Sequence, residues 1–101
     1  MGNEALKNAL GFAQRAGKVT AGDFACEKAV KSGKALLVAV DAGAAEATRL
    51  RYAGMCARAG IPCLCIEDMD AAIGRYGRKV AAVTDSGFAR MILQKTHGGV
   101  D

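Results

Sequence analysis

The sequence predicts an α/β fold: a three-layer α/β/α sandwich with a mixed, mostly parallel, four-stranded central sheet. Two observations predict it. Segments with helical spacing of apolar residues alternate with short apolar runs, which is typical of strands joined by crossover helices. The runs at residues 36–40 and 80–84 are apolar at nearly every position, which indicates strands that helices cover on both faces.

The N-terminal third is expected to contain two helices with a short strand between them. Apolar residues recur at helical spacing from Leu6 onward, and Gly17 supplies the left-handed residue that ends the first helix. Residues 18–20 then form a short extended segment. Residues 22–32 form a second helix, because their alanines and valine share one face while the charged residues lie off it, and Gly33 ends it.

The middle of the chain predicts a strand, a helix and a second strand. Residues 36–40 form the first of these strands, and a turn at residues 41–43 leads into a helix that runs to about Ala59. Gly60 ends this helix. The apolar run at residues 61–66 is the next strand, and its proline is tolerable because it lies near the beginning.

The last third completes the alternation. A short helix is expected around residues 68–73, and the apolar run at residues 80–84 forms the last buried strand. Asp85 or Ser86 then caps a closing helix, since either side chain can accept a hydrogen bond from the first helical amides.

Length and composition indicate one cytoplasmic domain. We expect residues 1–95 to form a single domain and residues 96–101 to be a flexible tail. No apolar stretch approaches the roughly 20 residues that a membrane span needs, and no apolar signal segment follows the N-terminus. The net charge of +4 suits an anionic partner without identifying one.

The four cysteines, at positions 26, 56, 63 and 65, do not form a Cys-x-x-Cys motif. The chain's one histidine, His97, lies in the Gly-rich tail. We expect buried free thiols, because cysteines in reducing compartments behave as small hydrophobic residues. A disulfide or a metal site is the alternative.

Motifs of catalysis are missing from the sequence. It has no phosphate-binding loop and no nucleophile elbow. Asp41 and Asp85 follow strands, where open α/β sheets place ligand sites, so a weak nucleotide-binding or phosphoacceptor enzyme is one alternative. Asp41 and Asp85 are better explained as turn or cap residues. Glu67, Asp68 and Asp70 could suggest a metal site, but they are better explained as acidic residues at the start of a helix. We expect no catalytic residue, cofactor or metal.

Basic residues gather in two places. The first surrounds the start and exposed face of the second helix: Arg15, Lys18, Lys28, Lys31 and Lys34. A helix beginning at Gly22 presents backbone amides and a partial positive charge to an anion, and glycine lets a phosphate approach closely. The alternative is that these lysines lie on an ordinary solvent-exposed face of the helix and bind no ligand.

The second basic cluster lies between the short helix and the last strand. It contains Arg75, Arg78 and Lys79, with two glycines and Tyr76. Such a loop can hold a phosphate backbone while Tyr76 stacks on a base; the alternative is a basic turn with Tyr76 packed as a lid. Few other aromatic residues are available for stacking, so structured RNA fits better than an open single strand.

Several segments follow the order, spacing and residue types of one known family: LGFAQRAGKV at 10–19, Gly22 with KAVKSGKA at 28–35, LVAVDA at 37–42, GIP at 60–62, AAIG at 71–74 and VTDSGFA at 83–89. Over residues 6–93 the chain resembles the kink-turn-binding ribosomal-protein family of the L-seven-Ae type, and within it the small bacterial YlxQ-like members. The resemblance implies an α/β/α sandwich that binds RNA through the start of its second helix and the loop before its last strand.

The resemblance also shows a departure. Family members that bind kink-turns well carry Gly-x-Asn-Glu-x-x-Lys at the helix start, where Asn and Glu contact sheared G·A pairs. Here Gly22 and Lys28 match, but Phe24 and Ala25 stand in the Asn and Glu positions and cannot hydrogen-bond to purine edges. An outward Phe24 would stack on a base, whereas an inward one would leave phosphate contacts alone.

We therefore expect a bacterial RNA-binding protein of ribosomal type that acts in translation, as a monomer without DNA or membrane partners. Its RNA would be ribosomal or kink-turn-like, with the ribosome as a further partner. The expected RNA-binding residues are Lys18, Gly22, Asp23, Phe24, Lys28, Lys31, Arg75, Tyr76, Arg78 and Lys79. The alternative is a non-catalytic protein-interaction adaptor on the same fold, since loss of the Asn-Glu pair is what such a change of use would produce.

Overall fold

The computed structural model describes residues 2–74 and 77–98, and helices and strands alternate along nearly all of this length. The elements in chain order are α1 (Gly2–Arg15), β1 (Val19–Ala21), α2 (Asp23–Lys31), β2 (Leu37–Asp41), α3 (Glu46–Ala59), β3 (Cys63–Ile66), α4 (Met69–Ile73), β4 (Val80–Val83) and α5 (Ser86–Gly98).

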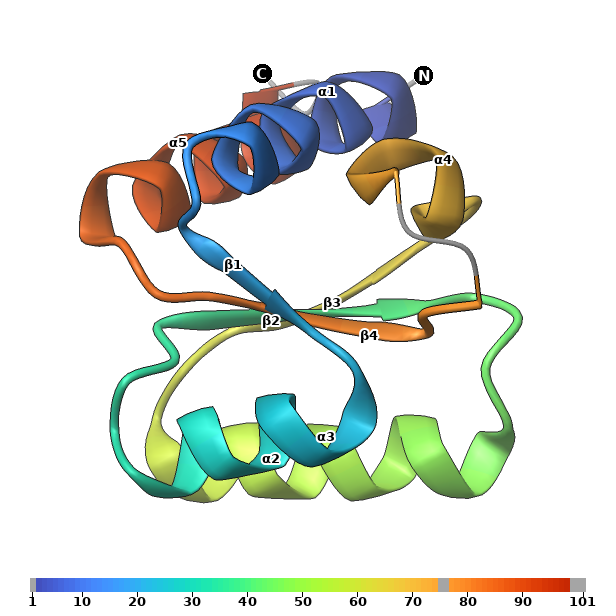
Figure 1. The fold of residues 1–101 in the computed structure, drawn as a ribbon, viewed down its shortest axis with the longest axis vertical. Helices are drawn as coiled ribbons and strands as arrows, with labels where there is room; N and C mark the ends of the chain where they lie inside the picture. The colour runs from blue at the N-terminus through green and yellow to red at the C-terminus, as the bar shows by residue number, and fades with distance from the viewer. Residues whose placement is uncertain (1, 75–76, 99–101) are drawn as a thin grey trace.

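The sheet lies between two helical layers. Figure 1 shows α1, α4 and α5 over one face and α2 and α3 over the other. Alternate side chains of β2 point to opposite faces: Val38 and Val40 pack with α2 and α3, whereas Leu37 and Ala39 pack with α1, α4 and α5. Every residue of β2 and β4 is buried, so the expected three-layer packing and the double coverage of these strands are confirmed.

The sheet is mixed, but the expectation that it is mostly parallel is wrong. Its strand order is β1-β4-β2-β3. Among the described strands, β2 and β3 form the one parallel pair, and β4 runs antiparallel to both of its neighbours.

The register shows the reason for the difference. Val80, the first residue of β4, lies beside Val40 near the end of β2, and Val83 lies beside Leu37 at the start of β2. The chain therefore re-enters the sheet at the end where β2 and β3 finish, and β4 runs in the opposite direction.

The predicted signals mark the ends of three helices. Gly17 and Gly60 adopt positive φ angles of 75° and 73° just after α1 and α3. Asp85 is the residue that caps α5, because its Oδ2 accepts a hydrogen bond from the Phe88 amide at 3.0 Å. Helix α5 continues to Gly98.

All four cysteines are free thiols, but they are not all buried. Cys26 and Cys56 are buried, Cys63 is half-buried and Cys65 is exposed. Burial raises the pKa of Cys26 and of Cys56 to about 12, so these two thiols stay protonated and unreactive at neutral pH. Among the described residues, no group of three or more His, Cys, Asp or Glu side chains is arranged to hold a metal ion. Within the same residues, every helix is too short or too polar to cross a bilayer.

Candidate nucleic-acid interface

Gly22 connects β1 to α2 in a backbone conformation that favours glycine. Its φ of 102° and ψ of 150° lie where an L side chain is strained. Its amide donates to the Val80 carbonyl at 3.0 Å, and its own carbonyl accepts from the Cys26 amide at 2.9 Å. The start of α2 is therefore fixed to the start of β4.

The same contacts bring the second basic cluster against the first. A Cβ atom built on Gly22 would lie 3.0 Å from Nη1 of Arg78, so the guanidinium rests directly against the glycine. A hollow of about 250 Å³ extends over both segments, and its lining residues are Gly22, Asp23, Thr48, Gly77, Arg78, Lys79 and Val80. The helix start and the loop that precedes β4 thus form one continuous surface.

The described part of the loop is exposed and tied to its surroundings at two points. The Gly77 amide donates to Oδ2 of Asp70 at 3.1 Å, and Nζ of Lys79 lies 3.5 Å from Oδ2 of Asp41. Arg78 and Lys79 are both exposed to solvent. The predicted site residues Arg75 and Tyr76 lie outside the described residues.

Asp41 is a structural residue. Its Oδ2 accepts from the Gly43 amide at 2.8 Å, and its Oδ1 accepts from the Met69 amide at 2.9 Å. Although burial acts to raise its pKa, these two amides and Lys79 hold the pKa below its ordinary value. Its carboxylate is therefore ionised and bonded at neutral pH, as expected for a turn residue.

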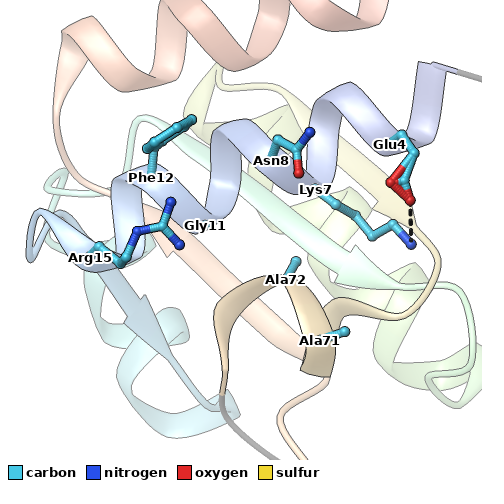
Figure 2. Close-up of a pocket in the computed structure, with 8 residues that line it drawn as sticks. All are labelled: Glu4, Lys7, Asn8, Gly11, Phe12, Arg15, Ala71 and Ala72. Carbon is cyan, nitrogen blue, oxygen red and sulfur yellow. Dashed lines mark ion pairs between the residues drawn. The ribbon is translucent and has the colours of Figure 1, made fainter.

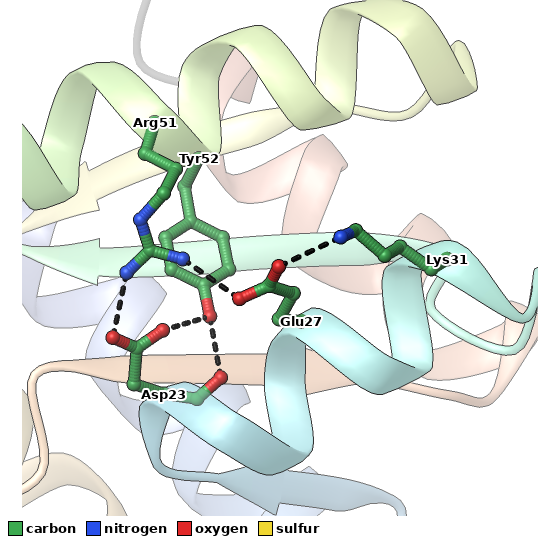
Figure 3. A network of polar contacts seen from close by, with 5 residues as sticks. All are labelled: Asp23, Glu27, Lys31, Arg51 and Tyr52. Atoms are coloured by element: carbon green, nitrogen blue, oxygen red, sulfur yellow. Dashed lines mark hydrogen bonds and ion pairs between the residues drawn. The ribbon is translucent and has the colours of Figure 1, made fainter.

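A polar network joins the first turns of α2 to α3 (Figure 3). Arg51 donates from Nη2 to Oδ2 of Asp23 at 2.6 Å and from Nη1 to Oε1 of Glu27 at 3.0 Å. The buried Tyr52 hydroxyl lies 2.6 Å from Oδ1 of Asp23 and 2.7 Å from its carbonyl oxygen, so its proton is shared between two acceptors. Lys31 pairs with Glu27 at 2.8 Å.

The network changes the charge beside the helix start. Hydrogen bonds from Tyr52 and Arg51 hold the pKa of Asp23 below its ordinary value, so this carboxylate is ionised at neutral pH. Arg51 compensates the two carboxylates nearest the helix start, which would otherwise repel an anion. Sequence reasoning missed Arg51 and Tyr52, because neither belongs to a motif and both approach Asp23 only through the packing of α3 on α2.

Phe24 points outward. Its side chain is 84% exposed, and it borders a shallow hollow of about 270 Å³ together with Glu27, Lys28 and Lys31. Ala25, in the other substituted position of the family pattern, is half-buried. Among the described residues, neither Lys28 nor Arg78 makes an ion pair. Lys31 pairs with Glu27, and Lys79 pairs with Asp41.

Lys18 lies away from these residues. Its carbonyl accepts from the Thr84 amide at the far end of β4, and four extended residues place it roughly 13 Å from Gly22. The structure therefore brings together Gly22, Asp23, Phe24, Lys28, Lys31, Arg78 and Lys79, but not Lys18.

Arg15, from the first basic cluster, also faces elsewhere. Its guanidinium carbon lies 4.8 Å from the centre of the Phe12 ring, at a hollow of about 370 Å³ between α1 and α4 (Figure 2). In the same hollow Lys7 pairs with Glu4 at 3.6 Å. Lys7 and Arg15 therefore both interact with side chains of the protein itself.

Comparison with known proteins places the chain in a family. No protein-family model matches it. RNA-binding protein YlxQ of Bacillus subtilis (strain 168) is 32% identical over 87 residues, which cover 83% of this chain and 87% of the relative. The chain belongs to the YlxQ-like group of the L-seven-Ae family. The residues that this YlxQ-like chain shares with the family pattern at the helix start, Gly22 and Lys28, lie on the surface described above.

Two solved structures have a similar fold. A protein of unknown function from Bacillus halodurans has a TM-score of 0.84 at 29% identity, covering 89% of this chain and 94% of that one. The Giardia lamblia 15.5kD RNA binding protein has a TM-score of 0.78 at 20% identity, covering 94% of this chain and 84% of that one, and shows the shared fold.

Proposed function

We propose that this protein binds structured RNA and holds the phosphate backbone with the start of α2 and residues 77–79. The observation that carries the proposal is the contact between Gly22 and Arg78, which places a guanidinium beside the positive end of a helix. The relative YlxQ and the Giardia protein, which shares the fold, are both named as RNA-binding proteins, and this supports RNA as the anion.

The cations on this surface are expected to contribute unequally. Lys28 and Arg78 make no ion pair among the described residues and so contribute most to phosphate binding. Lys31 pairs with the Glu27 carboxylate and Lys79 pairs with the Asp41 carboxylate, so both contribute less. Four phosphate contacts would give a log-log salt dependence of affinity with a slope of roughly −3 to −4.

The RNA we propose is kink-turn-like, within ribosomal RNA or another structured transcript. Phe24 and Ala25 cannot supply the hydrogen bonds to purine edges that Asn and Glu supply elsewhere in the family. Phosphate contacts position an RNA without reading its sequence, so recognition would depend on the shape of the backbone.

A fluorescence titration tests the proposal. The protein is titrated with a kink-turn RNA and with a matched duplex that lacks the kink, each at two salt concentrations. We expect tighter binding to the kink-turn RNA and weaker binding of both RNAs at high salt. No binding to either RNA, or affinity that does not change with salt, would refute RNA binding through phosphates.

The second candidate function is a non-catalytic adaptor that binds a protein. The observation that favours it is the exposed Phe24, since large exposed apolar side chains also mark protein contacts. A partner that remains bound to the protein after RNase treatment, and is lost in Phe24→Ala, would support the adaptor over the RNA-binding function.

A further inference from the structure

Phe24 has no role in the core of the protein. The residues that α2 buries are Cys26, Ala29 and Val30, and Phe24 lies on the opposite side with 84% of its side chain exposed. Leaving a phenyl ring in water forgoes the stabilisation that its burial would give. The fold therefore does not explain why a large aromatic residue stands here.

The surroundings of the ring are those of a binding surface. Phe24 shares a shallow hollow with Glu27, Lys28 and Lys31, which follow it at three, four and seven residues and so form one stripe along α2. Gly22 and Arg78 lie immediately beside the start of this stripe. The ring thus borders the phosphate-binding surface.

The charges in the hollow favour an uncharged planar group. Glu27 lies in the stripe with Lys28 and Lys31, and it pairs with Lys31 and with Arg51. A phosphate placed here would approach the Glu27 carboxylate. Beside Gly22 it would meet the Arg78 guanidinium and the positive end of α2, where Arg51 pairs with the Asp23 carboxylate. A nucleobase has the flat π-face that an exposed phenyl ring binds, and its own phosphate could remain with the cations.

We infer that Phe24 stacks on an unpaired nucleobase of the bound RNA. This inference rests on the proposed function and deepens it: stacking takes the place of the polar recognition that Asn and Glu provide at this helix start in the family. Stacking tolerates every base, so the site selects an unpaired nucleotide rather than a particular sequence.

The test uses a kink-turn RNA with 2-aminopurine at one unpaired position at a time. Stacking changes the fluorescence of the 2-aminopurine, and we expect one position to respond with the wild-type protein and not with Phe24→Ala. Phe24→Ala should weaken binding roughly 5- to 150-fold, the range for loss of one base stack, without changing the salt dependence. Phe24→Tyr should retain binding, because it keeps the aromatic face.

Two controls distinguish base stacking from a general apolar contact. An RNA that is abasic at the responding position should bind wild type and Phe24→Ala equally. Phe24→Leu should bind as weakly as Phe24→Ala; binding equal to wild type would indicate a general apolar contact and overturn stacking. If Arg78→Ala weakens binding while Phe24→Ala does not, the stacking inference fails and the proposed function stands. If wild type binds no RNA, both fail.

Discussion

The guanidinium of Arg78 rests against Gly22, where a Cβ atom would lie 3.0 Å from Nη1. Two segments that are far apart in the sequence therefore form one cationic surface, and the absence of a side chain at Gly22 permits the contact. The backbone angles at Gly22, φ 102° and ψ 150°, require glycine independently of the contact.

Replacement of Gly22 by alanine should therefore affect both stability and binding. We expect Gly22→Ala to lower the free energy of unfolding by about 1–3 kcal/mol through backbone strain, and to weaken RNA binding by displacing Arg78. Gly33→Ala is the control, since Gly33 also has a positive φ, of 81°, but a Cβ there meets nothing within 4 Å. Urea unfolding and RNA titration of both variants provide the measurement. Equal loss of RNA affinity in both would contradict the role of the contact.

The hydroxyl of Tyr52 should stabilise the start of α2. Tyr52→Phe removes the donor to Asp23, and we expect it to lower the free energy of unfolding by about 1 kcal/mol. A double-mutant cycle with Asp23→Ala measures the part of this effect that depends on the Asp23 carboxylate. Strictly additive losses would show that the two side chains are not coupled.

Arg51 should influence RNA affinity without touching the RNA. Arg51→Ala leaves the Asp23 carboxylate without a cation and Glu27 with Lys31 as its partner, both beside the proposed RNA-binding surface, and we expect weaker binding. Adding Asp23→Asn and Glu27→Gln to this variant should restore much of the lost affinity. Arg58→Ala, an exposed arginine in the last turn of α3, removes the same charge elsewhere. An equal loss in Arg58→Ala would mean that only total charge matters.

Acid should weaken the same end of α2. The pKa of Asp23 is lowered in the folded protein by Tyr52 and Arg51, so folding favours its ionised form. This contribution to stability is present above the ordinary pKa of 3.8 and is lost as the pH falls from there through the lower pKa of the folded state. The urea concentration at the unfolding midpoint should therefore decrease as the pH is lowered below about 4, and this decrease should be smaller in Asp23→Asn. An equal fall in both proteins would place the effect at other carboxylates.

Local signals in the sequence predicted most of the elements but not how they meet. Gly17 and Gly60 end their helices as expected, because a positive φ is a property of a single residue. The direction of β4 depends on the end of the sheet at which the chain re-enters after α4, and local residue patterns do not show this. The contact of Arg51 with Asp23 depends on how α3 packs against α2.

The outward position of Phe24 could have been predicted from the sequence. Cys26 lies two residues after it, and at about 100° per residue the two side chains are roughly 200° apart around the helix. Since Cys26 shares the apolar face with Ala29 and Val30, Phe24 must lie on the exposed side. The periodicity of α2 therefore predicts the direction of the Phe24 side chain, whereas the family pattern concerns only the residue type at this position.

The most direct test of the central claim compares the salt dependence of kink-turn RNA binding by wild type, Arg78→Ala and Lys18→Ala. If the surface at Gly22 holds phosphates, Arg78→Ala should weaken binding and reduce the log-log slope by about 0.7–0.9, the value of one lost phosphate contact. Lys18→Ala, at the other end of β1, should leave the slope unchanged. An unchanged slope in Arg78→Ala, or equal effects of the two variants, would contradict the placement of the RNA site.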